Sequence, residues 1–152
     1  MSPGTIRLHR VLRAPPERVY RAFLDAGALV KWLPPHGYTC VVHALDARVG
    51  GRFRMSFTHF ASGQCHSFDG EYLELVPNER IRHTDVFDDH HLSGTLYTTI
   101  RLRTVSCGTE LEVVQEGIPQ PVSIEACYLG WQDSLQLLVQ LVEAEVGPPP
   151  AP

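Results

Sequence analysis

The strongest pattern in the chain is an amphipathic stretch near its C-terminus, from Ser123 to Glu145. At 3.6 residues per turn, its apolar side chains fall on one narrow stripe, while its acidic and amide side chains lie away from that stripe. The stripe comprises Ile124, Cys127, Tyr128, Trp131, Leu135, Leu138 and Val142. The pattern therefore predicts one long helix with a single buried face.

The hundred residues before this helix alternate between apolar and polar positions with a period of two, which is typical of half-buried strands. Turn-forming residues separate the alternating segments, and the short links between them favour an antiparallel meander. The predicted strands are 5–13, 38–47, 52–60, 66–76, 80–87, 93–105 and 111–116. A curved sheet of this kind is the natural partner for the buried stripe of the helix.

Two short helices are predicted between the first two strands. The first follows Pro15 and Pro16 and reaches about Leu24, because proline is tolerated in the first turn of a helix. The second covers 28–33 and stops at a pair of prolines. We expect an α+β fold over a single domain, 1–152, with a core from about 5 to 145 and a disordered tail at 147–152.

Six short blocks of sequence accompany this order of elements, and together they span nearly the whole predicted core. The blocks are 14–23, 32–33, 49–53, 70–80, 108–111 and 130–135. In order and spacing they resemble the family named after the activator of Hsp90 ATPase, within the polyketide cyclase and START-like superfamily (SRPBCC). The resemblance implies the helix-grip fold more firmly than any activity, because this architecture hosts ligand carriers, cyclases and co-chaperone domains.

Charge and composition narrow the classes of partner. The formal net charge is −4 and no basic stripe is visible, so binding to nucleic acid or to an anionic membrane lacks its usual driving force. No apolar run approaches the roughly 20 residues that a membrane-spanning helix needs. The four cysteines are widely separated and form no C-x-x-C pair, which favours reduced thiols. We expect a cytoplasmic protein.

The eight histidines raise the question of a metal site, and the densest group of candidate ligands is the segment 88–91. Adjacent histidines in a loop between strands seldom converge on one ion, and no second pair with metal-binding spacing completes the set. We therefore expect neither a metal nor a cofactor.

A bent sheet around a helix leaves a cavity wherever side chains do not fill the space between them. The candidate lining residues are mostly aromatic, and an apolar or aromatic small molecule is the expected partner. They are Trp32, Phe53, Phe57, Phe68, Tyr72, His83, Phe87, Tyr97, Tyr128 and Trp131. The sequence leaves open the alternative that the same aromatic side chains simply pack together as a filled core.

His83 and Asp85 form the one pair that suggests catalysis. Strict alternation places them on the same strand face as Ile81 and Phe87, so an imidazole and a carboxylate would meet among apolar groups. Such a pair can remove a proton alpha to a carbonyl, with the Tyr97 hydroxyl supporting the enolate. A cyclase, aromatase or dehydratase therefore remains an alternative to a binding protein, and the sequence does not decide between them.

Two kinds of protein partner are also considered, an Hsp90-type chaperone and a second copy of the chain. The resemblance implies an Hsp90-type chaperone, but those co-chaperones usually carry an additional N-terminal domain, and here the first strand starts almost at once. The small-molecule role is therefore preferred. Leu129 and Leu137 on the outer side of the last helix leave room for a homodimer, although such residues can equally cover a neighbouring loop.

Overall fold

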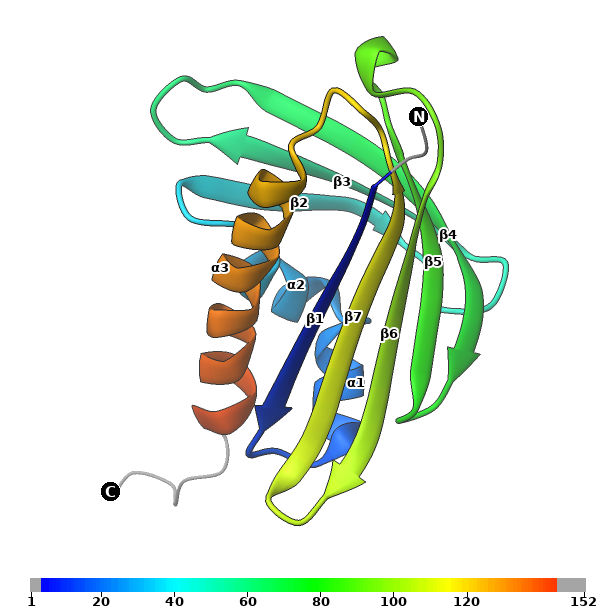
Figure 1. Ribbon diagram of the computed structural model, residues 1–152, viewed down its shortest axis with the longest axis vertical. Coiled ribbons are helices and arrows are strands. Elements are labelled where there is room, and N and C mark those ends of the chain that lie inside the picture. The colour runs from blue at the N-terminus through cyan, green and yellow to red at the C-terminus, as the bar shows by residue number, and fades with distance from the viewer. Residues whose placement is uncertain (1–3, 145–152) are drawn as a thin grey trace.

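A computed structural model describes residues 4–144 and shows seven strands and three α-helices (Figure 1). The strands are β1 (Gly4–Leu12), β2 (Tyr38–Leu45), β3 (Arg52–His59), β4 (Cys65–Val76), β5 (Arg80–Phe87), β6 (Leu96–Val105) and β7 (Gly108–Ile118). The helices are α1 (Pro16–Ala22), α2 (Ala26–Trp32) and α3 (Ile124–Ala144), with a short 3-10 helix η1 (His90–Leu92) before β6. Glu145 and the predicted tail at 147–152 lie outside the described residues.

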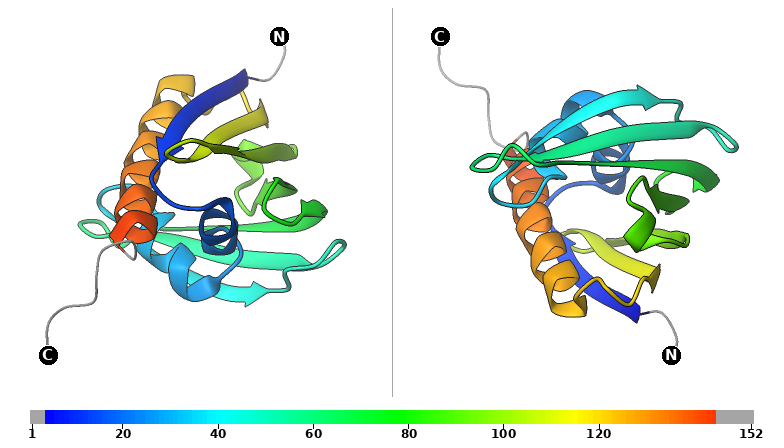
Figure 2. Two further views of the ribbon diagram at one scale, coloured as in Figure 1. Left: turned by 90° about the horizontal axis from the view of Figure 1, so that it is seen from below. Right: turned by 90° about the horizontal axis from the view of Figure 1, so that it is seen from above.

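The strands form one antiparallel sheet in the order β1-β7-β6-β5-β4-β3-β2. Figure 2 shows that this sheet bends round and that α3 lies across its open side. Helix α3 contacts β1 at one edge of the sheet and also α2, which in turn contacts β2 at the other edge. The expected helix-grip fold is therefore confirmed. None of the described helices is long and apolar enough to span a membrane.

Irregularities in the ladders help the sheet to bend. The pairing of β4 with β5 shifts between Tyr72 and Glu74, and that of β2 with β3 shifts between Val42 and Ala44. A β-bulge of this kind bends its strand and increases the local twist. Gly117 near the end of β7 has a φ of 78°, a conformation that glycine adopts without strain.

The predicted stripe of α3 is buried most completely in the second half of the helix. Leu135, Leu138 and Val142 are essentially inaccessible to solvent and belong to the main core. In the first half, Trp131 is only partly buried. Tyr128 remains 38% exposed, so it is not fully buried as the predicted stripe requires. The two halves of α3 therefore differ in their surroundings.

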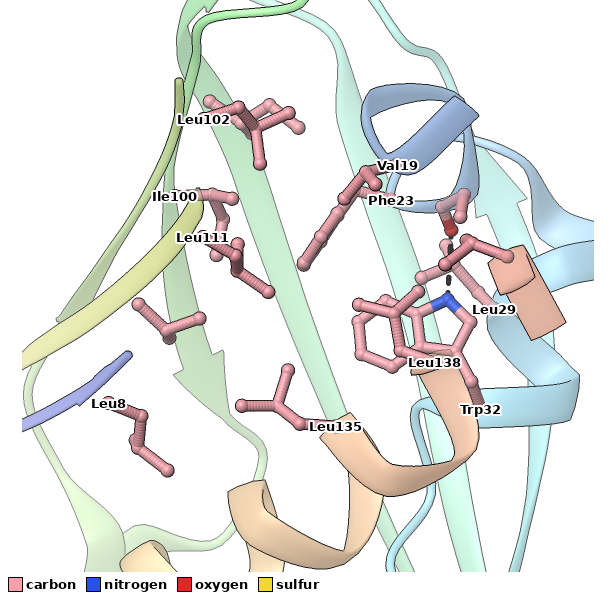
Figure 3. Packing of buried hydrophobic residues seen from close by; sticks show 14 of the residues in the cluster. Leu8, Val19, Phe23, Leu29, Trp32, Ile100, Leu102, Leu111, Leu135 and Leu138 are labelled. Carbon is pink, nitrogen blue, oxygen red and sulfur yellow. Dashed lines mark hydrogen bonds between the residues drawn. The ribbon is translucent and has the colours of Figure 1, made fainter. Parts of the chain in front are cut away.

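Trp32, the last residue of α2, packs into the hydrophobic core (Figure 3). Its side chain is fully buried, its Nε1–H donates a 2.9 Å hydrogen bond to the carbonyl of Ala22, and its ring lies edge-on to Phe23 at 4.8 Å. A buried indole needs such a partner for its N–H group, and here the last residue of α1 supplies it.

Some helices and strands begin at a different residue than predicted, because a capping side chain or a turn precedes them. Helix α2 begins at Ala26 because the Asp25 carboxylate accepts a 2.9 Å hydrogen bond from the backbone N–H of Ala28. Strand β6 begins at Leu96 and not at Ser93, because η1 and a glycine with positive φ come first. Strand β7 is longer than predicted at both ends.

Candidate ligand-binding site

A cavity of about 230 Å³ lies between the concave face of the sheet and the helices α2 and α3. Alternation along β3, β4 and β5 directs every second side chain into it. The sheet contributes Phe53, Met55, Phe57, Phe68, Tyr72, Ile81 and Phe87. The segments on the other side contribute Leu29, Leu33, Pro35, Cys127 and Trp131. The walls are therefore largely apolar, and many of the side chains are aromatic.

The aromatic rings on the sheet side contact one another in fixed orientations. The Phe68 ring lies edge-on to Phe57 at 5.3 Å and to Phe53 at 6.3 Å. It also lies 5.9 Å from Phe87, and Phe53 lies 5.4 Å from Tyr72. These centroid distances fall in the range that aromatic pairs prefer. The rings therefore hold one another in position along this wall.

Gly70 on β4 allows the Phe53 ring to lie where it does. The two residues are directly paired across β3 and β4. A Cβ atom at position 70 would overlap both the Phe53 ring and the backbone carbonyl of Thr84. The absent side chain thus makes room for one of the rings that line the cavity.

A chain of hydrogen bonds lies along the polar side of the cavity and links the sheet to α3. The Thr98 hydroxyl donates to Asp85 Oδ2 at 2.7 Å. The Gln115 side-chain amide donates to the Thr98 oxygen at 3.1 Å, and its carbonyl accepts from Nε1 of Trp131 at 3.3 Å. Asp85 and Thr98 are buried, and each finds partners in this chain. The network therefore fixes the positions of both the carboxylate and the indole.

His83 lies at the end of this network. Its Nδ1 atom is 3.2 Å from the carbonyl oxygen of Thr84 and 3.4 Å from Oδ1 of Asp85. Because a carbonyl oxygen only accepts hydrogen bonds, Nδ1 carries a proton, and Nε2 is the nitrogen left to face a ligand. The ring packs edge-on against Phe53 at 5.1 Å. Its orientation is thus fixed from two sides.

Two opposing effects act on the pKa of His83. Burial disfavours the charged imidazolium and lowers the pKa, but the charge of Asp85 and the hydrogen bonds to Asp85 and Thr84 raise it by more. The net shift of the pKa is upward from the ordinary value of 6.5. The contact with Asp85 therefore favours the protonated imidazolium.

Two further ionisable groups in the wall are held neutral. Burial, followed by the charge of Asp85 and the proximity of Tyr20, raises the pKa of Tyr72. Burial also raises the pKa of the Cys127 thiol. A protonated thiol is a poor nucleophile, so Cys127 acts as a wall residue and not as a reactive cysteine.

The structure brings most of the predicted lining residues together at the cavity. These are Phe53, Phe57, Phe68, Tyr72, His83, Phe87 and Trp131, and the candidate acid Asp85 joins them. The predicted alternation along β5 is also correct, since Ile81, His83, Asp85 and Phe87 all line the same space.

Three predicted lining residues lie elsewhere. Trp32 belongs to the core described above, and the Tyr128 hydroxyl accepts a 3.2 Å hydrogen bond from the backbone N–H of Arg7 on the edge strand β1. Tyr97 is 37% exposed on the outer face of β6, with the Arg82 guanidinium 5.0 Å from the centre of its ring. Because its neighbour Thr98 points inward, the Tyr97 hydroxyl is on the wrong face to assist His83.

Sequence reasoning missed the polar partners Thr98 and Gln115. The signal was present, because alternation puts Thr98 on the same face as the buried Ile100, and Gln115 on the same face as Val113. A polar residue at an inward position of a strand is unusual and marks a buried hydrogen-bond network or a site. Phe23, Leu29 and Leu33 were missed because helical spacing alone does not show which turn faces the cavity.

Within residues 4–144, no three His, Cys, Asp or Glu side chains are grouped so as to hold a metal ion. The acidic residues of the segment 88–91 have other roles. Asp88 pairs with Arg54, and the Asp89 carboxylate caps η1 by accepting a hydrogen bond from the N–H of His91.

Comparison with solved structures shows close relatives of this fold. A crystal structure of a Chromobacterium violaceum protein is 65% identical, with a TM-score of 0.91 over 91% of this chain and 96% of that chain. Two more distant proteins share the fold. The one from Rhodobacter sphaeroides is 21% identical, with a TM-score of 0.83 over 94% of this chain and 97% of that chain. The one from Nitrosomonas europaea is 22% identical, with a TM-score of 0.76 over 93% of this chain and 96% of that chain.

No curated protein is significantly similar to the chain. The model of one family, described as "Activator of Hsp90 ATPase homolog 1-like protein", matches residues 13–143. This match covers six of the seven strands and the helices α1 and α2 entirely, and α3 except for its last residue. The chain therefore belongs to the family of Activator of Hsp90 ATPase homolog 1-like proteins.

Proposed function

We propose that the protein binds a small aromatic or otherwise apolar molecule in the cavity between the sheet and α3. The observation that carries this proposal is the wall of mutually braced aromatic rings beside a short row of convergent polar groups. This combination of apolar walls with a few fixed polar atoms is typical of small-molecule sites. By contrast, the groove at Arg101 and Glu112 is lined mainly by charged side chains.

The volume of the cavity limits the size of the ligand. A cavity of about 150 Å³ in another protein holds benzene, and sites for drug-sized molecules have about 300–1,000 Å³. At about 230 Å³, this cavity fits a molecule with one ring or two fused rings. A long-chain lipid would have to leave much of its length outside.

Tryptophan fluorescence provides the test, because the two tryptophans report on different places. Trp131 lines the cavity and donates a hydrogen bond to Gln115, whereas Trp32 is sealed in the core. We expect toluene, anisole and 4-nitroanisole to change the emission of the wild-type protein in a saturable way. The Trp131→Phe variant, which keeps Trp32, should show little of this response.

A pair of variants on α3 separates cavity binding from surface adsorption. Cys127→Phe adds a ring to the cavity wall and should weaken binding of all three probes. Leu129→Phe places the same ring on the outer side of the helix, where the native leucine is 59% exposed, and should leave binding unchanged. A folded wild-type protein that responds to none of the probes would refute the proposal. Equal binding by both variants would place the probes outside the cavity.

The His83–Asp85 pair favours a second candidate function, which is proton transfer to and from a bound carbonyl compound. The Asp85 carboxylate holds Nδ1–H, so Nε2 is positioned as a base beside the cavity. We expect the wild-type protein to accelerate deuterium exchange at the methyl group of acetophenone above the buffer rate. The His83→Gln variant should not, and equal rates for the two proteins would reject this function.

A further inference from the structure

The polar groups of the cavity differ in how much hydrogen-bonding capacity they have left. Both oxygens of Asp85 are engaged, one by His83 and one by Thr98. The hydroxyl of Thr98 donates to Asp85 and accepts from Gln115. The Gln115 carbonyl accepts from Trp131. Each of these groups therefore already has a hydrogen-bond partner within the network.

His83 is the exception in this row. Its Nδ1 atom faces Thr84 and Asp85, and its side chain is buried among aromatic rings yet keeps 19% of its surface accessible beside the cavity. The Nε2 atom accepts a hydrogen bond when the ring is neutral and donates one when it is charged. His83 therefore presents a two-way hydrogen-bonding atom, Nε2, to whatever occupies the apolar space.

The charges around the cavity limit which ligand groups this atom can receive. The titratable side chains that line it are His66, Tyr72, His83, Asp85 and Cys127, and no arginine or lysine is among the described lining residues. Tyr72 and Cys127 stay neutral because burial raises the pKa of each. The single carboxylate of Asp85 already matches the charge that His83 carries when protonated. A permanently charged ligand would therefore find no unpaired opposite charge in the cavity, and burying an unpaired charge in an apolar site is costly.

We propose that the ligand is a small aromatic molecule with a phenol- or enol-type hydroxyl, and that this hydroxyl binds Nε2 of His83. This inference rests on the proposed function and adds the chemical class of the ligand. A weakly acidic hydroxyl suits both states of the imidazole. The neutral ring accepts the O–H hydrogen bond, and when the proton moves, the O–H bond breaks, the Nε2–H bond forms and an oxyanion faces the imidazolium. Asp85 then stabilises that imidazolium from the other side.

The experiment compares 4-nitrophenol with its methyl ether, 4-nitroanisole, by isothermal titration calorimetry. The two probes have nearly the same shape, but only the phenol has a proton to donate. We expect the wild-type protein to bind 4-nitrophenol about tenfold more tightly, as one hydrogen bond to an ionisable group would give. In His83→Gln the preference should disappear while 4-nitroanisole binds as before. Unchanged binding of the ether also shows that the variant is folded.

Each other outcome overturns a defined part of the reasoning. If the wild-type protein binds both probes equally, or if His83→Gln keeps the preference, the hydroxyl inference is wrong and the proposed function stands. If 4-nitrobenzoate binds more tightly than 4-nitrophenol, the site selects an anion and the argument from charge is wrong. If the folded wild-type protein binds none of the three probes, the proposed function falls and this inference falls with it.

Discussion

The same substitution, glycine to alanine, should have opposite effects at Gly70 and Gly130. Both residues lie inside regular elements, Gly70 in β4 and Gly130 in α3, and neither has a positive φ. At Gly130 a Cβ atom would meet nothing within 4 Å. At Gly70 it would overlap the ring of Phe53 and the backbone carbonyl of Thr84. The local sequence gives no hint of this difference.

The expected magnitudes follow from these surroundings. In a helix interior, alanine is more favourable than glycine by about 0.8–1.0 kcal/mol, so Gly130→Ala should raise the free energy of unfolding by about that amount. Overpacking a close-packed site costs about 1–3 kcal/mol, and at Gly70 one of the two neighbours is backbone, which cannot rotate away. Gly70→Ala should therefore lower the free energy of unfolding, with the cost at the upper end of that range.

Thermal unfolding followed by circular dichroism measures both effects. In a domain of this size, 1 kcal/mol corresponds to a shift in Tm of about 2–4 °C. We expect Tm to rise by about 2–4 °C in Gly130→Ala and to fall by roughly 4–12 °C in Gly70→Ala. The displaced Phe53 ring in Gly70→Ala should also weaken the binding of 4-nitroanisole. Shifts of the same sign in the two variants would refute the reasoning.

Three further predictions concern ionisation and packing. Asp85→Asn should lower the pKa of His83, and NMR titration measures this change. The loss of stability in this variant should be largest below pH 6.5 and should shrink as pH rises through the raised pKa of His83. An unchanged pKa of His83 would contradict the pairing with Asp85. Glu143→Gln should cost up to about 1 kcal/mol at pH 7 in urea unfolding. The N–H and guanidinium groups of Arg13 lower the pKa of Glu143, so this deficit should vanish as pH falls through that lowered pKa, and a deficit that persists in acid would exclude the ion pair. Trp32→Ala should cost about 3–5 kcal/mol, and a smaller loss would show that the core refills the space.

The sequence by itself determined the elements and their order. Periods of two and 3.6 residues identified all seven strands and three helices, because burial of one face imposes a repeat that survives in the one-dimensional pattern. The same alternation correctly placed Ile81, His83, Asp85 and Phe87 on one face of β5. Orientation within a single strand is a local property, so it can be read along the chain.

The tertiary structure decided which of the inward-facing side chains share one space. Tyr128 lies on the predicted stripe of α3, yet it contacts the edge strand β1, because the angle at which α3 crosses the sheet is set by packing at many distant positions. Thr98, which donates to Asp85, comes from β6, whereas Gln115 comes from β7 and Trp131 from α3, and no spacing in the sequence connects them. A cavity is the volume that packing leaves unfilled, and that volume depends on all of the surrounding elements at once.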